Sequence, residues 1–255
     1  MNAAAVETPS RLGRRRAGRI LLAILAVVAL IVVGFLVYAA MVMRGDRAAA
    51  INVWTNPAIA VTSTDHSIIM APTGHAAGSG LVFIPGAKVD PYAYMYKLSG
   101  IVEKAGVTVV ITKPTLNLAF FDQRLLSAFT SDVPAVSKWY VGGHSLGGVR
   151  ACMLADSPDV AGLVLFGSFC ANDLSASAVK VLSISGSEDG LSTPAKIADS
   201  KHLLPSNATF VVIEGADHAS FGDYGPQPGD GVATITSSQA RDEITAALAS
   251  FFPAP

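Results

Sequence analysis

Gly142-Gly143-His144-Ser145-Leu146-Gly147-Gly148 is the stretch of this sequence that decides its fold. It contains the pattern G-x-S-x-G, which is typical of a serine held on a sharp turn between a strand and a helix. The glycines let the strand and the helix approach closely, and they tolerate the backbone conformations that such a turn needs. Because so short a pattern also occurs by chance, it gains weight only if a strand precedes it and a helix follows it.

Apolar runs and helical patterns alternate on both sides of this stretch. Short apolar runs predict buried strands, preceded by a small hairpin at 60–64 and 67–70. These strands are expected at 81–84, 107–112, 138–141, 163–166, 179–185 and 210–213, and helices at 91–105, 121–129, 146–155, 193–204 and 238–252. The alternation predicts an α/β fold in which helices cover both faces of a mostly parallel sheet of about six to eight strands.

A long apolar segment precedes this domain. Hydrophobic residues make up 51% of the chain and the mean hydropathy is +0.47, and the excess is concentrated at residues 20–43. This segment is longer than the roughly 20 residues that span a bilayer. Five arginines precede it and only Arg44 and Arg47 follow it closely. The positive-inside rule therefore predicts a single-pass plasma-membrane anchor, with a cytoplasmic N-terminus and an extracytoplasmic folded domain.

A cleaved signal peptide is the alternative interpretation, with Ala48-Ala49-Ala50 as a conceivable cleavage site. The apolar region of a signal peptide usually has about 7 to 15 residues, so the sequence favours a retained anchor. The chain then divides into a basic tail (1–19), the anchor (20–43), a linker (44–57) and the folded domain (58–255).

Three residues of this domain form a candidate catalytic set. Ser145 needs a base and a group that orients the base, and in a parallel sheet such groups lie in loops at the carboxyl ends of strands. Asp189 follows the predicted strand at 179–185, and His218 follows the one at 210–213. In this set His218 would take the serine proton, and Asp189 would orient the imidazole and stabilise its charged form.

Alternatives remain at each of these positions. Ser145 could be an ordinary helix N-cap, and Glu188 could be the acid in place of Asp189. Asp217 more simply caps the local turn, and the remaining histidines fall in less suitable places.

An oxyanion formed at this site needs two N–H donors. The backbone N–H of Leu146 follows the serine, and Ala87 lies in the loop after the strand at 81–84. Lys88 is the neighbour that would shape the mouth of the site.

The sequence carries no pattern for a metal or cofactor. The five histidines are scattered and the two cysteines have no metal-ligand spacing. The stretch 142–148 lacks both the lysine of a P-loop and the G-x-G-x-x-G run of a dinucleotide-binding loop. We expect no cofactor and no nucleic-acid partner. We also expect Cys152 and Cys170 to be free thiols, because the predicted helix and strand place them beyond disulfide reach.

The sequence resembles the α/β-hydrolase superfamily, and more narrowly its small, lidless, dienelactone-hydrolase-like branch. The resemblance covers about residues 80–252. It is carried by Phe83-Ile84-Pro85-Gly86-Ala87-Lys88-Val89-Asp90-Pro91, Gly143-His144-Ser145-Leu146-Gly147-Gly148, Gly186-Ser187-Glu188-Asp189-Gly190 and Asp217-His218-Ala219-Ser220-Phe221-Gly222-Asp223-Tyr224-Gly225. It implies an α/β-hydrolase fold with Ser145, Asp189 and His218 at the catalytic positions, and Ala87 and Leu146 at the oxyanion positions. Dienelactone hydrolase itself has a cysteine where this chain has Ser145.

Only a short segment separates Phe166 from Val179, where many lipases and esterases insert a helical cap. The site is therefore expected to be shallow and open, with Lys88 and Phe121 among the residues that contact substrate. The loop 219–231 could help to form the site or could be a surface connector. These features predict a serine carboxylesterase-like hydrolase acting on a small-molecule ester. Acyl transfer by the same residues and a non-catalytic binding domain are the alternatives.

Overall fold

The computed structural model describes residues 11–252, with side chains from residue 15, and divides the chain into two units, 1–41 and 42–255. Within the first unit, helix α1 (Arg11–Ala40) includes Arg15–Ala40, a stretch with a mean hydropathy of 3.4 that is long and apolar enough to cross a membrane. A signal sequence would have the same character. The predicted basic tail lies partly outside the described residues, and the apolar helix ends three residues before the predicted end of the anchor.

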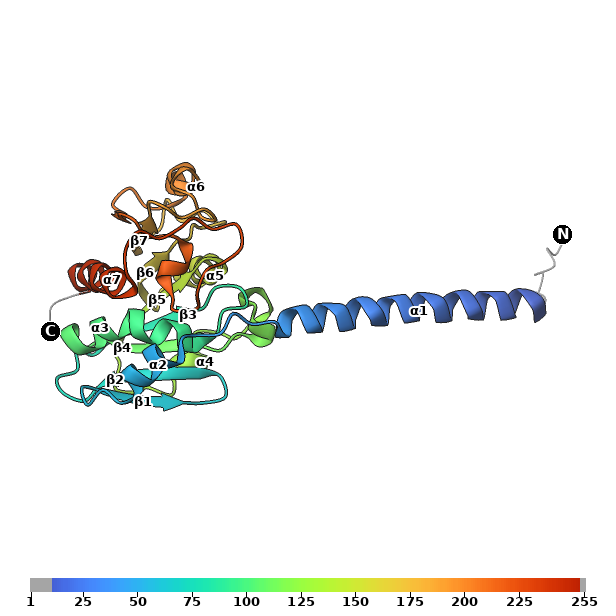
Figure 1. Ribbon diagram of the computed structural model, residues 1–255, viewed down its shortest axis with the longest axis horizontal. Helices are drawn as coiled ribbons and strands as arrows, with labels where there is room; N and C mark the ends of the chain where they lie inside the picture. Colours follow the sequence, from blue (N-terminus) through green and yellow to red (C-terminus); the bar gives the residue numbers. More distant parts are fainter. Residues whose placement is uncertain (1–10, 253–255) are drawn as a thin grey trace, which may run out of the picture. The chain divides into compact units, whose positions relative to one another are not determined.

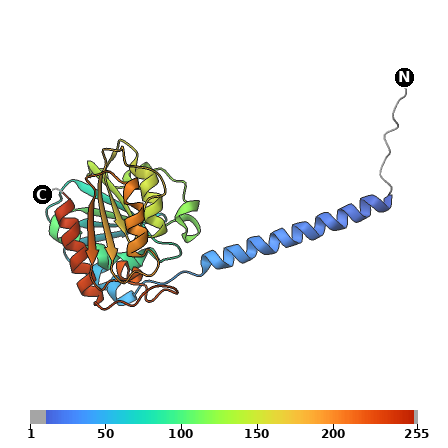
Figure 2. The same ribbon diagram turned by 90° about the horizontal axis from the view of Figure 1, so that it is seen from above.

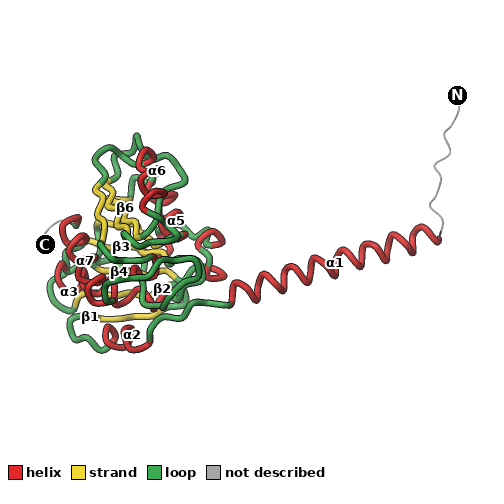
Figure 3. The backbone as a smooth tube through the Cα atoms, turned by 45° about the horizontal axis from the view of Figure 1, so that its top comes forward, coloured by secondary structure: helices red, strands yellow, loops and turns green. Residues whose placement is uncertain are grey.

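The second unit is built on one eight-stranded sheet, shown in yellow in Figure 3. The strands are β1 (Ile59–Ser63), β2 (Ser67–Pro72), β3 (Ser79–Ile84), β4 (Thr108–Thr112), β5 (Lys138–His144), β6 (Val160–Phe166), β7 (Lys180–Gly186) and β8 (Thr209–Ile213). Their order is β1-β2-β4-β3-β5-β6-β7-β8. Strand β2 pairs antiparallel with β1 and β4, and the remaining pairs are parallel. The predicted fold class, including the hairpin at the sheet edge, is confirmed.

Helices cover both faces of this sheet (Figures 1 and 2). Helices α3 (Met95–Ala105) and α7 (Ser237–Phe251) pack against each other and contribute to the larger hydrophobic cluster. Helix α5 (Leu146–Ala155) contributes to a second cluster, and α6 (Pro194–Ser200) packs against β7. Strand β6 serves both clusters, because Val164 and Phe166 belong to the first while Leu163 and Leu165 belong to the second. This alternation follows from the two-residue period of a strand and explains its unbroken apolar sequence.

Two segments differ from the expected secondary structure. The range 44–57, expected to be a linker, contains helix α2 (Arg47–Trp54), which buries Val53 and packs on α3. The range 121–129, expected to be one helix, is mostly loop, with a single turn of helix at α4 (Ser127–Thr130) and 3-10 turns before it at Thr115–Asn117 and Ala119–Phe121. The helix expected at 121–129 does not form over its whole length, because Asp122 turns inwards and interrupts the helical pattern.

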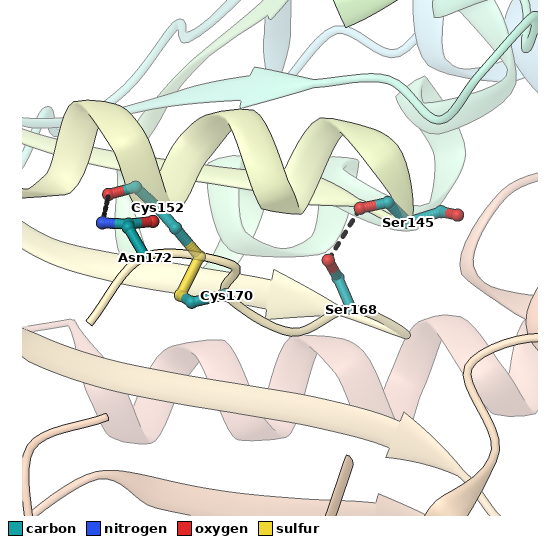
Figure 4. Close-up of a disulfide and its surroundings, with 5 residues drawn as sticks. All are labelled: Ser145, Cys152, Ser168, Cys170 and Asn172. Carbon is teal, nitrogen blue, oxygen red and sulfur yellow. Dashed lines mark hydrogen bonds between the residues drawn. A yellow bond between two sulfur atoms is a disulfide. The ribbon is translucent and has the colours of Figure 1, made fainter. Parts of the chain in front are cut away.

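The expectation of free thiols is wrong. Cys152 and Cys170 form a disulfide, with their Cα atoms 5.5 Å apart. After β6 the chain reverses and runs back along α5, as Figure 4 shows. Ser168 Oγ donates to the carbonyl of Ser145 (2.7 Å), and Asn172 Nδ2 donates to the carbonyl of Cys152 (3.3 Å). This reversal brings Cys170 to the second turn of α5, and no pattern in the sequence predicts the reversal.

Removing the disulfide should destabilise the protein. It closes a loop with a sequence separation of 18, and cross-links of that length stabilise by about 3 kcal/mol through the entropy of the unfolded chain. We expect a Cys152→Ala/Cys170→Ala variant of the full chain to lose about that much free energy of unfolding in denaturant titration. Met153→Ala, which truncates an exposed side chain on the same helix, is the control and should cost less than about 0.5 kcal/mol.

Candidate active site

Ser145 lies on a strained turn between β5 and α5. Its φ of 51° and ψ of −122° lie outside the regions that residues other than glycine prefer. Its neighbours must be small, because a Cβ at Gly143 would come within 2.4 Å of the Gly147 carbonyl carbon. A Cβ at Gly147 would lie 2.0 Å from the carbonyl oxygen of Ile84. The stretch 142–148 therefore has the predicted geometry, and Ser145 is partly exposed at its tip.

Asp189 and His218 meet beside this turn although they are 29 residues apart in sequence. His218 Nδ1 lies 2.8 Å from Asp189 Oδ2, and both side chains are almost fully buried. The other oxygen, Asp189 Oδ1, accepts the N–H groups of Leu191 (2.9 Å) and Ser192 (2.6 Å). These bonds hold the carboxylate as an acceptor towards His218 Nδ1 and so place the proton of that nitrogen on the Asp189 side. Within residues 11–252, His218 Nε2 has no hydrogen-bond partner.

Residues 166–168 connect the serine turn to the Asp189–His218 pair. The N–H of Ser145 donates to the Phe166 carbonyl (3.1 Å), and Ser168 Oγ donates to the Ser145 carbonyl. Between them, a Cβ on Gly167 would come within 2.9 Å of Asp189 Oδ2 and 3.2 Å of His218 Nδ1. The end of β6 thus touches all three sequence-predicted residues, and Gly167, with a φ of 45°, leaves room for the imidazole.

Asp230 is hydrogen-bonded both to the turn after Asp189 and to the turn that begins with His218. The sequence did not predict this role. Its Oδ1 accepts the N–H groups of Gly190 (3.1 Å) and His218 (3.0 Å), as well as that of Gly231. Its Oδ2 accepts the N–H of Ala219 (2.9 Å). One carboxylate therefore joins the turn after Asp189 to the turn that begins with His218. The sequence left two roles possible for the loop 219–231, a part of the site or a surface connector. The loop contributes Asp230 to the candidate site.

The two expected oxyanion donors have no acceptor among the described residues. The amides of Ala87 and Leu146 donate no hydrogen bond to any residue in the described part of the chain, and both residues are partly exposed. Their loops are in contact, because Gly147 packs directly on the carbonyls of Ile84 and Pro85. Two unpaired N–H groups beside a serine are the arrangement that an oxyanion requires.

Tyr94 and His144 form a buried hydrogen-bonded pair that also holds Gly86, the residue before Ala87. The sequence did not predict this pair. The N–H of Gly86 donates to Tyr94 Oη (2.9 Å), which is also hydrogen-bonded to His144 Nδ1 (2.9 Å), and burial raises the pKa of the phenol. Burial also lowers the pKa of His144 well below its usual value, and the neighbouring His218 lowers it further. The His144 ring, whose centroid is 4.4 Å from that of His218, therefore stays neutral and puts no second positive charge beside the candidate base.

The mouth of the site is strained. Four residues other than glycine have positive φ in residues 11–252: Lys88, Leu116, Asn117 and Ser145. The N–H of Lys88 donates to the Asn117 carbonyl (2.8 Å), which joins the oxyanion loop to the loop that carries Phe121. Backbone strain of this kind concentrates at functional sites. Lys88 is partly exposed and Phe121 is exposed, so both side chains are accessible to solvent.

A family model for the alpha/beta hydrolase family matches residues 80–242, the part of the chain that carries this whole arrangement. The chain belongs to the alpha/beta hydrolase family. Its mostly parallel eight-stranded sheet with helices on both faces is therefore that of an α/β hydrolase. No curated protein matches the sequence.

Solved structures agree with this fold. The chain is similar to a serine hydrolase without a lid from Xanthomonas campestris, with 14% identity over 78% of this chain and 98% of that one and a TM-score of 0.52. It is equally similar to the esterase domain of a Rhodothermus marinus protein, with 14% identity, coverage of 76% and 97%, and a TM-score of 0.52. Identities this low support the shared fold alone. In this hydrolase too, only residues 167–179 join β6 to β7, and no cap domain is present in the described range.

Asp230→Asn should slow catalysis while the hydrolase stays folded. The amide keeps the size of the side chain, but it replaces one acceptor oxygen with an N–H₂ group that faces backbone N–H donors. We expect kcat towards an ester to fall by about 10- to 100-fold with a smaller change in KM, because the Asp189–His218 geometry loosens. Steady-state kinetics, with circular dichroism as the folding check, measure this. Asp159→Asn, on an exposed turn, is the control, and an equal loss of activity in both variants would contradict the role of Asp230.

Proposed function

We propose that this hydrolase cleaves carboxylic esters through an acyl-enzyme on Ser145, with His218 as the base and Asp189 as its orienting acid. The observation that carries the proposal is the buried Asp189–His218 bond next to the serine turn, with His218 Nε2 left without a partner in residues 11–252. Esterases are among the proteins that share the fold, and the family model covers all three residues.

The proposed reaction proceeds in two halves. His218 Nε2 takes the proton of Ser145 Oγ as this oxygen bonds to the ester carbonyl carbon. The carbonyl oxygen becomes an oxyanion, which the N–H groups of Ala87 and Leu146 stabilise. When the carbon–oxygen bond to the alcohol breaks, the alcohol leaves with the proton from His218, and an acyl group remains on Ser145. Water then repeats the sequence, releasing the carboxylic acid and restoring the serine.

The charge that develops on His218 is compensated on one side only. Asp189 faces Nδ1 and stabilises the imidazolium, whereas His144 on the ring face stays neutral. The open mouth, without a cap between β6 and β7, suits a substrate that approaches from a surface.

Ser145→Ala should abolish this activity. Removing the nucleophile of a serine hydrolase lowers kcat by about 10³-fold or more, because no other group forms the acyl-enzyme. Hydrolysis of 4-methylumbelliferyl butyrate by the purified full chain measures the loss, and a fluorophosphonate probe should label the wild type but not the variant. Ser127→Ala, which removes an exposed hydroxyl on α4, should keep full activity. Unchanged hydrolysis in the Ser145 variant would refute the proposal.

We also propose that α1 is retained as a membrane anchor, with the hydrolase domain outside a bacterial plasma membrane. The conceivable cleavage site at Ala48-Ala49-Ala50 lies inside α2, which packs on the domain. The N–H of Met43 donates to the Lys88 carbonyl (2.7 Å), and its carbonyl accepts the N–H of Asp90 (2.9 Å). Cleavage at the alanines would break a folded helix and remove this pairing.

The retained anchor predicts that the mature protein keeps its full mass of 26.3 kDa and stays in the membrane fraction after an alkaline carbonate wash. Immunoblotting of fractionated cells with a C-terminal epitope tag measures both properties. A released form about 5 kDa smaller would indicate a cleaved signal peptide instead.

A further inference from the structure

The loop between β4 and α4 has an inverted distribution of side chains. The carboxylate-bearing Asp122 is buried, with 6% of its surface exposed. In the same loop Phe120 is 52% exposed and Leu125 is 71% exposed, and Leu116 is exposed as well. Folding normally buries phenylalanine and leucine and leaves aspartate in water. A loop that does the reverse presents an apolar surface to its surroundings.

Internal hydrogen bonds maintain this arrangement. Arg124 forms a two-pronged ion pair with Asp122, through Nε (2.7 Å) and Nη2 (2.5 Å), and Nη2 also donates to the Lys113 carbonyl (2.7 Å). Gln123 Nε2 donates to the Phe120 carbonyl (2.7 Å). The polar residues thus bind the loop to itself and to the end of β4. Phe120 and Leu125 remain mostly exposed within the domain.

The chain enters the domain beside this loop. Helix α1 ends at Ala40, and three peptide units, spanning at most about 11 Å, reach Met43. Met43 is hydrogen-bonded to the Lys88 carbonyl, and the Lys88 N–H is bonded to the Asn117 carbonyl. Lys88 therefore links Met43, three residues after the end of α1, to the loop, and Ala87 next to it is a candidate oxyanion donor.

We propose that the exposed loop residues Leu116, Phe120 and Leu125 dock on the lipid surface next to the anchor, and that the ester substrate is an amphiphile drawn from that surface. The proposal rests on the proposed function and on the retained anchor. The lipid bilayer is the partner expected for this loop, because only three peptide units separate the end of α1 from Met43. A segment this close to a membrane-spanning helix is held at the membrane. There the apolar side chains gain the burial that the domain does not provide.

The position of the site gives this docking a chemical purpose. The Lys88–Asn117 hydrogen bond joins the loop of the proposed oxyanion donor Ala87 to the docking loop, so the proposed site lies next to the lipid surface on which that loop docks. The site has no cap, and an acyl chain can remain in the lipid while only the ester group reaches Ser145. A long-chain ester embedded in the bilayer should therefore be a better substrate than its short, water-soluble counterpart.

Docking can be measured without any activity. The full chain carrying Phe120→Trp is reconstituted in phosphatidylcholine vesicles with or without brominated acyl chains, which quench tryptophan on contact. Val212→Trp is the matched control, because Val212 is also 52% exposed but lies on β8 at the far edge of the sheet. We expect the fluorescence added at position 120 to fall at least about twofold in brominated vesicles, and that at position 212 to remain. Equal quenching at the two positions would overturn the proposal.

Substrate selection is measured with two esters of one leaving group. In the same vesicles, we expect Phe120→Asn/Leu125→Asn to lower hydrolysis of 4-methylumbelliferyl palmitate about tenfold and that of the butyrate less than about twofold. Val212→Asn should change neither rate. An equal effect on both esters would overturn the proposed substrate class. If the wild type cleaved neither ester, the proposed function would fail, and the quenching comparison would still decide whether the loop docks.

Discussion

The close contact of Gly147 with the carbonyls of Ile84 and Pro85 is the constraint on which the rest of this structure depends. A side chain at Gly147 would push α5 away from β3, since its Cβ would lie 2.0 Å from the Ile84 oxygen. That contact sets Ser145 at its strained φ and brings the Leu146 amide to the same edge as Ala87. One packing contact between a helix and a strand end thus positions the proposed nucleophile and the proposed oxyanion donors.

The remaining parts of the site are assembled around this contact by long-range polar bonds. Asp230 joins the two turns that carry Asp189 and His218, and Tyr94 joins Gly86 to the neutral His144. The Asp230–Gly190 and Tyr94–His144 bonds join residues 40 and 50 positions apart in sequence, and buried polar networks of this kind specify one arrangement. At the same edge of the domain, Met43 is hydrogen-bonded to the backbone of Lys88 and Asp90, next to the proposed oxyanion donor Ala87.

The sequence predicted the sheet, the order of its strands along the chain and the contact of Asp189 with His218, because strand ends in a parallel sheet gather at one edge. It did not predict the disulfide. The separation of Cys152 and Cys170 depends on the reversal after Phe166, which Ser168 and Asn172 stabilise by bonds to the helix backbone. It also missed Asp230, because backbone N–H donors leave no mark in the sequence. Helix α2 was taken for a linker, since a short helix owes its stability to packing such as that of Val53.

By itself, the sequence determined the local features of this protein: the apolar helix, the buried strands and the glycine-flanked serine turn. These follow from composition and spacing within a few residues. Only the tertiary structure decided which polar groups face one another, that the cysteines are joined, and that Asp122 turns inwards while Phe120 and Leu125 face outwards. These features depend on contacts between segments far apart in the chain. Such contacts form only once the sheet has brought those segments together.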